Sequence, residues 1–192
     1  MTAVLISGPL VEPVSLSEAK AHLRVDLADE DTLINSLIVA ARIHVEAHIR
    51  RVFITQTWSI YVDEWVQGKP LNLPISPVQS VSAINIYDAD NSFITTDPIA
   101  YVVDAVSFPA RILWRGAGSC PRPGRALNGI EIIVTAGYGN DANQVPQPIR
   151  QAILMLIAQW FEHRQPPTLN GSEEPVPPAV ASLLNSYVQV RL

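Results

Sequence analysis

Two histidines, His44 and His48, have the residue type and the spacing that most readily suggest chemistry. They lie four residues apart in a segment with helical periodicity, so both fall on one helix face, where imidazoles can bind a metal ion. The intervening Glu46 stands at the wrong position for the His-Glu-x-x-His motif of zinc proteases. A metal site needs three or four ligands, and no clear further ligand pair accompanies the histidines. We therefore predict no metal site here.

The other candidates for chemistry have simpler structural interpretations. Cys120 lacks a recognisable catalytic neighbourhood, and Gly116–Gly118 lacks the third glycine of a dinucleotide fingerprint. The acidic run Asp29–Asp31 suits a helix N-terminus, where the macrodipole favours carboxylates. Thr135–Gly139 superficially resembles an ion-channel filter, but it is better interpreted as a strand end followed by a glycine turn. The sequence therefore predicts no catalytic residue and no cofactor.

The composition excludes several classes of function. The net charge of −5 opposes a surface that grips nucleic acid, because phosphate binding depends on clustered Lys and Arg. A single cysteine permits no internal disulfide, which is compatible with a reducing cytoplasm. The N-terminus lacks the basic region of a signal peptide, and the longest apolar stretch, residues 152–158, is too short to cross a bilayer. We expect a soluble protein with no membrane partner.

Two helices are predicted near the N-terminus. Ser15 and Glu18 form a Ser-x-x-Glu capping box, which predicts a short helix that begins at Leu16. Asp29–Asp31 supply a cap and first-turn negative charge for a longer second helix, which reaches Arg51. The apolar stripe of this second helix consists of Leu33, Ile34, Leu37, Ile38, Ala41, Val45 and Ile49.

Helices return in the last third of the chain. Pro146 and Pro148 suit the first turn of a helix, which we expect to be largely buried and to pack on the helix of residues 30–51. Residues 164–178 are interpreted as a polar, proline-rich linker, and residues 179–187 as a last short helix. The apolar face of the first of these helices consists of Ile149, Ala152, Ile153, Leu156, Ile157, Trp160 and Phe161.

Between these helices the hydrophobic period changes to two, as expected of half-buried antiparallel strands. We predict that the segments up to residue 95 form a meander, and that the later segments complete a set of about six strands, a common size for one sheet. Residues 71–74 are a shorter strand candidate, and Arg115–Arg125 is predicted to be an exposed loop. The strand segments are residues 57–63, 81–87, 92–95, 101–104, 111–114 and 129–136.

This order of elements predicts an α+β fold in which a small antiparallel β module is inserted into a helical body. The helical body comprises residues 1–54 and 145–192, and the β module comprises residues 55–144.

Taken together and in this order, the segments resemble the head-tail connector proteins of tailed bacteriophages and gene transfer agents, also called adaptor or head-completion proteins. The resemblance is carried by residues 13–25, 29–42, 54–58 and 145–152, and it covers roughly residues 13–163. Its specificity lies in the order of the motifs rather than in any one of them. It implies a structural virion protein and not an enzyme.

The resemblance also implies partners and a location. Connectors of this kind form a ring, which we take as dodecameric, in the neck of the particle beneath the portal protein and above the stopper or tail-completion protein. The ring extends the DNA channel, through which DNA passes without sequence-specific binding, and it is made and assembled in the bacterial cytoplasm. Ala136–Gly139 matches the junction between the last strand and the late helix in this family.

Two regions are predicted to make the interfaces. A short helix after a linker can order on binding, so the segment of residues 180–192 is the predicted portal contact. Two tryptophans near strand ends are predicted subunit contacts, because aromatic residues are enriched at interface centres. The predicted interface residues are Val180, Leu183, Leu184, Tyr187, Val188, Val190, Leu192, Trp65 and Trp114.

Three other functions remain open from the sequence. The β module could belong to a non-viral protein that binds a carbohydrate or a peptide, and a shallow aromatic groove on the sheet would favour that function. The chain could be another virion component, such as a stopper or a tail terminator. An enzyme with a His44/His48 metal centre is the third, and metal analysis of the purified protein would test it. Apolar patches on opposite sides of the monomer would favour a ring.

Overall fold

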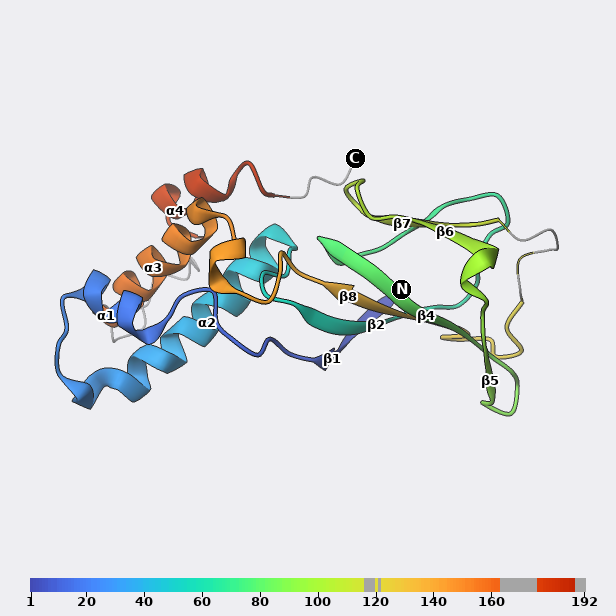
Figure 1. Cartoon of the computed structure of the whole chain (residues 1–192), viewed down its shortest axis with the longest axis horizontal. Helices are drawn as coiled ribbons and strands as arrows, with labels where there is room; N and C mark the ends of the chain where they lie inside the picture. Colours follow the sequence, from blue (N-terminus) through green and yellow to red (C-terminus); the bar gives the residue numbers. More distant parts are fainter. Residues whose placement is uncertain (116–119, 121, 163–175, 189–192) are drawn as a thin grey trace, which may run out of the picture. The chain divides into compact units, whose positions relative to one another are not determined.

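A computed structural model describes residues 1–115, 120, 122–162 and 176–188 of the chain. Within these residues, four α-helices come from the N- and C-terminal parts, and eight strands form two antiparallel sheets. Figure 1 shows the course of the chain through these elements. The predicted α+β fold class, with helices flanking a central β region, is therefore confirmed.

The chain divides into two compact units. The β unit comprises Met1–Leu10 and Thr55–Tyr138, and the helical unit comprises Val11–Ile54 and Gly139–Leu192. Each unit thus draws on two separate stretches of the sequence. The domain boundaries that the sequence suggested stay a prediction.

The helical unit begins with α1 (Leu16–Leu23), and its start has the predicted capping box. The Ser15 hydroxyl accepts a hydrogen bond from the Glu18 backbone N–H at 3.2 Å, and the Glu18 carboxylate accepts from the Ser15 N–H at 2.9 Å. The 3-10 helix η1 (Ala28–Glu30) leads into α2 (Asp31–Ile49). Of the predicted stripe on α2, Ile34, Ile38, Ala41, Val45 and Ile49 are buried, whereas Leu33 and Leu37 are half-buried.

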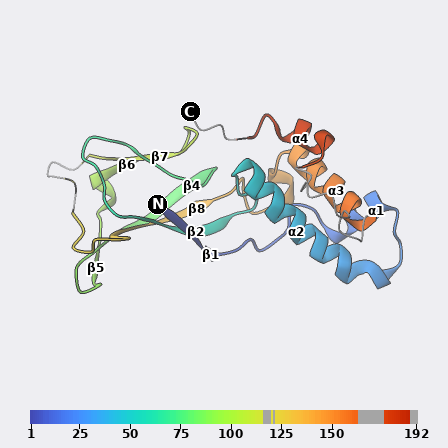
Figure 2. The ribbon, with the colours of Figure 1, turned by 180° about the vertical axis from the view of Figure 1, so that it is seen from behind.

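Helix α3 (Gln147–Glu162) follows the 3-10 helix η3 (Ala142–Gln144) and carries Pro148 in its first turn. It packs against α2, as predicted, and also contacts α1 and α4 (Pro178–Leu184). Figure 2 shows the same four helices from behind. In the described part of the chain, none of the helices combines the length and the apolar character that a membrane crossing requires. The residues that α3 buries are Ile149, Ala152, Ile153, Leu156 and Ile157.

The larger sheet of the β unit has five antiparallel strands in the order β1-β2-β8-β4-β5. One face is strongly apolar, because Ile60, Ile84 and Ile132 lie on it and are fully buried. The strands are β1 (Thr2–Ser7), β2 (Gln56–Val62), β8 (Ile130–Ala136), β4 (Val78–Tyr87) and β5 (Phe93–Thr95).

The smaller sheet has three antiparallel strands in the order β3-β7-β6. They are β3 (Leu71–Asn72), β7 (Arg111–Trp114) and β6 (Tyr101–Asp104), and the 3-10 helix η2 (Pro98–Ala100) precedes β6. Ile112 on the central strand is fully buried.

The prediction of a single meander is wrong. The last strand, β8, lies between β2 and β4, and the segments at residues 71–72, 101–104 and 111–114 form a second sheet. Strand β1, which pairs with β2, was not among the predicted strands. Alternation in a sequence fixes which side chains share a face, but it does not determine which strands pair over long separations.

The predicted strand end and glycine turn at residues 135–139 are present. Strand β8 ends at Ala136, and Gly137 has a φ of 131°, a region that favours glycine. The Gly137 N–H donates to the Pro77 carbonyl at 2.8 Å, and its carbonyl accepts from the Gln79 side chain at 2.9 Å. This residue thus fixes the exit from the sheet toward η3.

Candidate functional site

A buried carboxylate, Glu131, lies at the centre of the five-stranded sheet. It is only 9% exposed, on the middle strand β8. The backbone register places Tyr61 of β2 and Asn85 of β4 directly opposite it on the two sides. Burying a carboxylate is costly unless its oxygens are hydrogen-bonded. Its surroundings must therefore supply donors.

Four side chains donate to this carboxylate, and we call them with Glu131 the carboxylate network. The Ser59 hydroxyl and the Tyr61 phenol donate to Oε1 at 2.7 and 2.8 Å. The Asn85 amide and the Tyr87 phenol donate to Oε2 at 3.0 and 2.9 Å. Because the donors come from β2 and β4, the network ties both strands to β8.

The network sets the protonation of its members. Burial alone would raise the pKa of Glu131, but the hydrogen bonds from its four donors outweigh this effect and hold the pKa below its usual value. The hydrogen bond to Glu131 raises the pKa of Tyr61, and burial together with the same carboxylate raises the pKa of Tyr87. Glu131 is therefore a charged acceptor at neutral pH and not a general acid.

Acid is expected to weaken the β unit through this carboxylate. Because the pKa of Glu131 is lower in the folded chain, its contribution is fully present above the unfolded value of about 4.3 and is lost as the pH falls through the folded pKa. Urea unfolding between pH 7 and pH 3 should therefore show a declining free energy of unfolding below about pH 5.

The variant Glu131→Gln provides the control, because the glutamine side chain does not ionise. Glu18, Asp90 and Asp104 also have lowered pKa values, that of Asp104 reaching about 2, and they contribute equally in both proteins. The difference between the two pH profiles therefore isolates Glu131. Identical declines in the two proteins would contradict the prediction.

A pocket of about 360 Å³ lies beside the network. The Arg125 guanidinium lies over the Tyr87 ring, 4.3 Å from its centroid, and donates to the Leu127 and Asn128 carbonyls at 3.1 and 2.5 Å. The hydrogen-bonding groups of Arg125 and Glu131 are thus already used within the chain. The arrangement supports a structural role for the network. The pocket is lined by Thr2, Val4, Tyr61, Tyr87, Arg125 and Asn128.

The two tryptophans predicted as subunit contacts lie against each other inside the β unit. The rings of Trp65 and Trp114 meet edge to face, with centroids 5.9 Å apart and planes at 72°. Trp65 is only 6% exposed, and its indole N–H donates to the Lys69 carbonyl at 3.4 Å. In the described residues the buried Trp114 indole nitrogen has no partner. Their role in a subunit contact stays a prediction, and the pair already packs within one chain.

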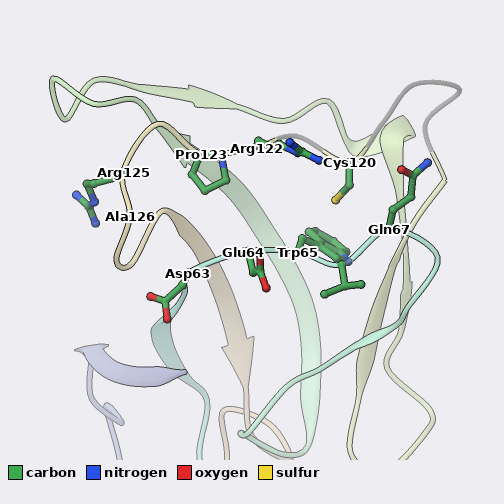
Figure 3. Close-up of a pocket in the computed structure, with 10 residues that line it drawn as sticks. Asp63, Glu64, Trp65, Gln67, Cys120, Arg122, Pro123, Arg125 and Ala126 are labelled. Atoms are coloured by element: carbon green, nitrogen blue, oxygen red, sulfur yellow. The ribbon is translucent and has the colours of Figure 1, made fainter.

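A second, larger pocket of about 760 Å³ lies beside Trp65. Figure 3 shows Cys120 and Gln67 near the indole, with Asp63 and Arg125 farther along the pocket. Acidic, basic and apolar side chains are mixed on its walls, and Trp65 is too buried to present a stacking face. This pocket therefore lacks the shallow aromatic groove that would favour carbohydrate binding.

The predicted portal-contact residues divide into two groups by their burial. Val180 and Leu184 are 1% and 0% exposed, because α4 packs on α3, so they anchor the helix within the chain. Leu183, Tyr187 and Val188 are half-buried. Val190 and Leu192 lie outside the described residues.

The residues that follow α4 contact the residues that follow α2. Arg51 Nε donates to the Tyr187 carbonyl at 2.8 Å, and the guanidinium carbon lies 5.8 Å from the centre of the Tyr187 ring. This contact holds Tyr187, which follows α4, against Arg51, which follows α2.

The histidines, Cys120 and the acidic run, which were the candidates for chemistry in the sequence, show no catalytic arrangement in the described residues. His44 meets the Trp160 ring edge to face at 5.6 Å, and His48 is exposed. Burial raises the pKa of the Cys120 thiol, which lowers its thiolate fraction. Asp31 forms an ion pair with Lys20 at 2.5 Å. Among the residues that the structure describes, no three His, Cys, Asp or Glu side chains gather to hold a metal ion.

Comparisons with known proteins agree with this picture of a structural chain. Residues 13–107 match the family described as phage gp6-like head-tail connector protein. No curated protein matches the sequence. Solved structures of gene transfer agent (GTA) particles and particle necks contain similar chains.

A chain in the structure described as "Neck of empty GTA particle computed with C6 symmetry" is 25% identical, with a TM-score of 0.83 over 100% of this chain and 97% of that chain. A chain in "Virion of native gene transfer agent (GTA) particle" is 25% identical, with a TM-score of 0.81 and the same coverage. A chain in "Neck of native GTA particle computed with C12 symmetry" is 23% identical, with a TM-score of 0.76 and again the same coverage. The last likeness concerns the fold alone.

The sequence match and the structural matches are complementary. The family match covers α1, α2 and residues 55–107 of the β unit, and the similar neck chains extend the likeness over the whole length. The family consists of structural connectors and not of enzymes, so the prediction of a non-enzymatic protein is confirmed. The chain belongs to the phage gp6-like head-tail connector family.

Proposed function

We propose that this connector forms a ring in the neck of a phage or gene transfer agent particle, between the portal protein and the stopper or tail-completion protein. One observation carries the proposal, namely the likeness over the full length, at 25% identity, to a chain in the neck of a GTA particle. A ring of twelve copies is supported by the C12 symmetry of another neck structure that contains a chain of this fold.

The ring's task is geometric. Twelve copies around an axis would extend the DNA channel of the portal and offer a docking face to the next component. The net charge of −5 suits a channel wall that lets DNA slide, because DNA binding needs clustered cations. Assembly would take place in the bacterial cytoplasm before the neck is complete.

The portal contact is proposed for the last turn of the helical unit and the residues that follow it. Val180 and Leu184 hold α4 on α3, which leaves Leu183, Tyr187 and Val188, and beyond them Val190 and Leu192, to contact the portal. A helix can lay its apolar residues into a groove of a partner protein.

Native mass spectrometry of the full chain, alone and mixed with the portal ring from the same source, tests the ring. We expect a discrete complex with one connector copy per portal subunit. A chain that stays monomeric and ignores the portal would overturn the proposal and favour the ligand-binding module.

A separate pair of variants tests the portal contact. Leu183→Asp should weaken portal binding at least tenfold, because it places a charge in an apolar contact. Ser182→Asp, at an exposed position of the same helix, adds the same charge and should leave binding unchanged. Circular dichroism verifies that both variants fold. Equal binding by the two variants would contradict the contact and leave the ring proposal standing.

A further inference from the structure

The two outer strands of the five-stranded sheet are unprotected edges. Strand β1 exposes Val4 and Ile6 by 45% and 60%, and β5 exposes Phe93 and Ile94 by 53% and 69%. Neither strand contains a charged residue or a proline. Exposed apolar edge strands pair readily with other chains, and monomeric proteins normally block them with charges or prolines.

The edges of the smaller sheet differ from these. Strand β3 has only two residues and lies between Lys69-Pro70 and Pro74. Strand β6 ends at Asp104, which forms an ion pair with Arg111 at 2.8 Å. Strand β5 is also short, but β1 and β5 both expose apolar side chains, whereas β3 has only the half-buried Leu71 and the polar Asn72. This contrast favours pairing at the edges of the larger sheet.

The strand order makes the two open edges complementary. Every neighbouring pair in β1-β2-β8-β4-β5 is antiparallel, so β1 and β5 run in the same direction at opposite edges. Extending the sheet from β5 of one copy to β1 of the next would pair them in parallel. This contact leaves a free β5 on the second copy for a third copy, so it is heterologous and can close into a ring. A contact between two β1 strands would stop at a dimer.

We propose that β1 of one copy pairs with β5 of its neighbour, so that the five-stranded sheets join around the ring. This inference rests on the proposed ring and names the strands that build it. The exposed Val4 would pack against Phe93 of the adjacent copy, because both residues lie on the face of the sheet that carries Glu131, and the contact removes apolar surface from water.

Charged substitutions on the two edges test the contact. Ile6→Lys and Ile94→Lys should each raise the protein concentration needed for ring assembly at least tenfold, because a lysine on an edge strand opposes pairing. Val106→Lys, in the turn between β6 and β7 where Val106 is 89% exposed, is the matched control and should assemble as the unmodified chain does. Assembly is read by native mass spectrometry over a concentration series.

Crosslinking identifies the strands that meet. In a Cys120→Ser background, Val4→Cys combined with Phe93→Cys, which lie on the same face of the sheet, should give a ladder of covalent oligomers longer than a dimer with a short bismaleimide reagent. Each single cysteine variant should give no ladder. Efficient dimers from Val4→Cys alone would reveal a contact between two β1 strands and overturn the inference.

The outcomes for the inference and for the proposed function are distinct. If the unmodified chain forms rings, but both lysine variants assemble at the same concentration and no ladder forms, the edge contact is wrong and the ring stands. If the unmodified chain forms no ring with or without the portal, the proposed function itself fails.

Discussion

Replacing Glu131 by alanine is expected to lower the free energy of unfolding of the β unit by about 3 kcal/mol. The substitution leaves Ser59 and Asn85, which are 1% and 5% exposed, without their acceptor, and each buried unpaired donor costs about 1–3 kcal/mol. The half-buried Tyr61 and Tyr87 hydroxyls can turn toward water, so they add less. For a chain of this size the melting temperature should fall by about 6–12 °C.

Urea unfolding followed by tryptophan fluorescence provides the measurement, because Trp58, Trp65 and Trp114 all belong to the β unit. Glu64→Ala is the control, since it removes an exposed carboxylate of the same unit and should change stability by less than about 0.5 kcal/mol. The double variant Ser59→Ala/Glu131→Ala should lose less than the sum of the two single losses. Additive losses would show that the hydrogen bond between these side chains does not couple them.

The helices of this protein follow from local signals. The capping box at Ser15 and Glu18 and the apolar stripe of α2 involve residues three or four apart, so the chain's own neighbours determine them. The packing of α3 on α2 was also predictable, because each helix had one broad apolar face to bury.

For the sheets, only the individual strand segments were predicted, and not which strands pair. Strands β6 and β7 have the expected bounds, but the place of β8 between β2 and β4 depends on contacts between distant parts of the sequence. Strand β1 was missed because Thr2–Ser7 has apolar side chains on both faces and therefore no clean alternation. In the structure those same side chains are exposed, which is the basis of the edge contact proposed above.

The carboxylate network has a recognisable signal in the sequence. Glu131 is the second residue of β8 and the one charged residue in this otherwise mostly apolar strand, and a buried charge in such a strand requires partners. The donors sit at alternate positions on β2 and β4, where Ser59 and Tyr61, and Asn85 and Tyr87, share a face. Only the register between the strands shows that the four donors meet at one carboxylate.

A second large loss of stability is expected in the helical unit from Arg42→Ala. Arg42 is 7% exposed, and it donates to Glu12 at 2.7 Å and to Glu46 at 2.9 Å. Burial alone would lower the pKa of Arg42, but the two carboxylates outweigh it and raise the pKa, so the guanidinium stays charged. Removing one partner of a buried ion pair leaves the other uncompensated, and the expected cost is about 3 kcal/mol.

The effect should exceed that of a surface charge because Glu46 has a further role. Its other carboxylate oxygen accepts from the Phe53 N–H at 2.8 Å, so Arg42 and Glu46 together hold the segment before α1, through Glu12, and the segment after α2, through Phe53. Thermal unfolding should show a melting temperature about 6–12 °C lower for Arg42→Ala, whereas His48→Ala, exposed on the same helix, should shift it by about 2 °C or less. Glu12→Ala should cost less than Arg42→Ala, because Glu46 still neutralises the guanidinium. Equal losses from Arg42→Ala and Glu12→Ala would show that Glu12 alone carries the ion pair and that Glu46 does not compensate the arginine.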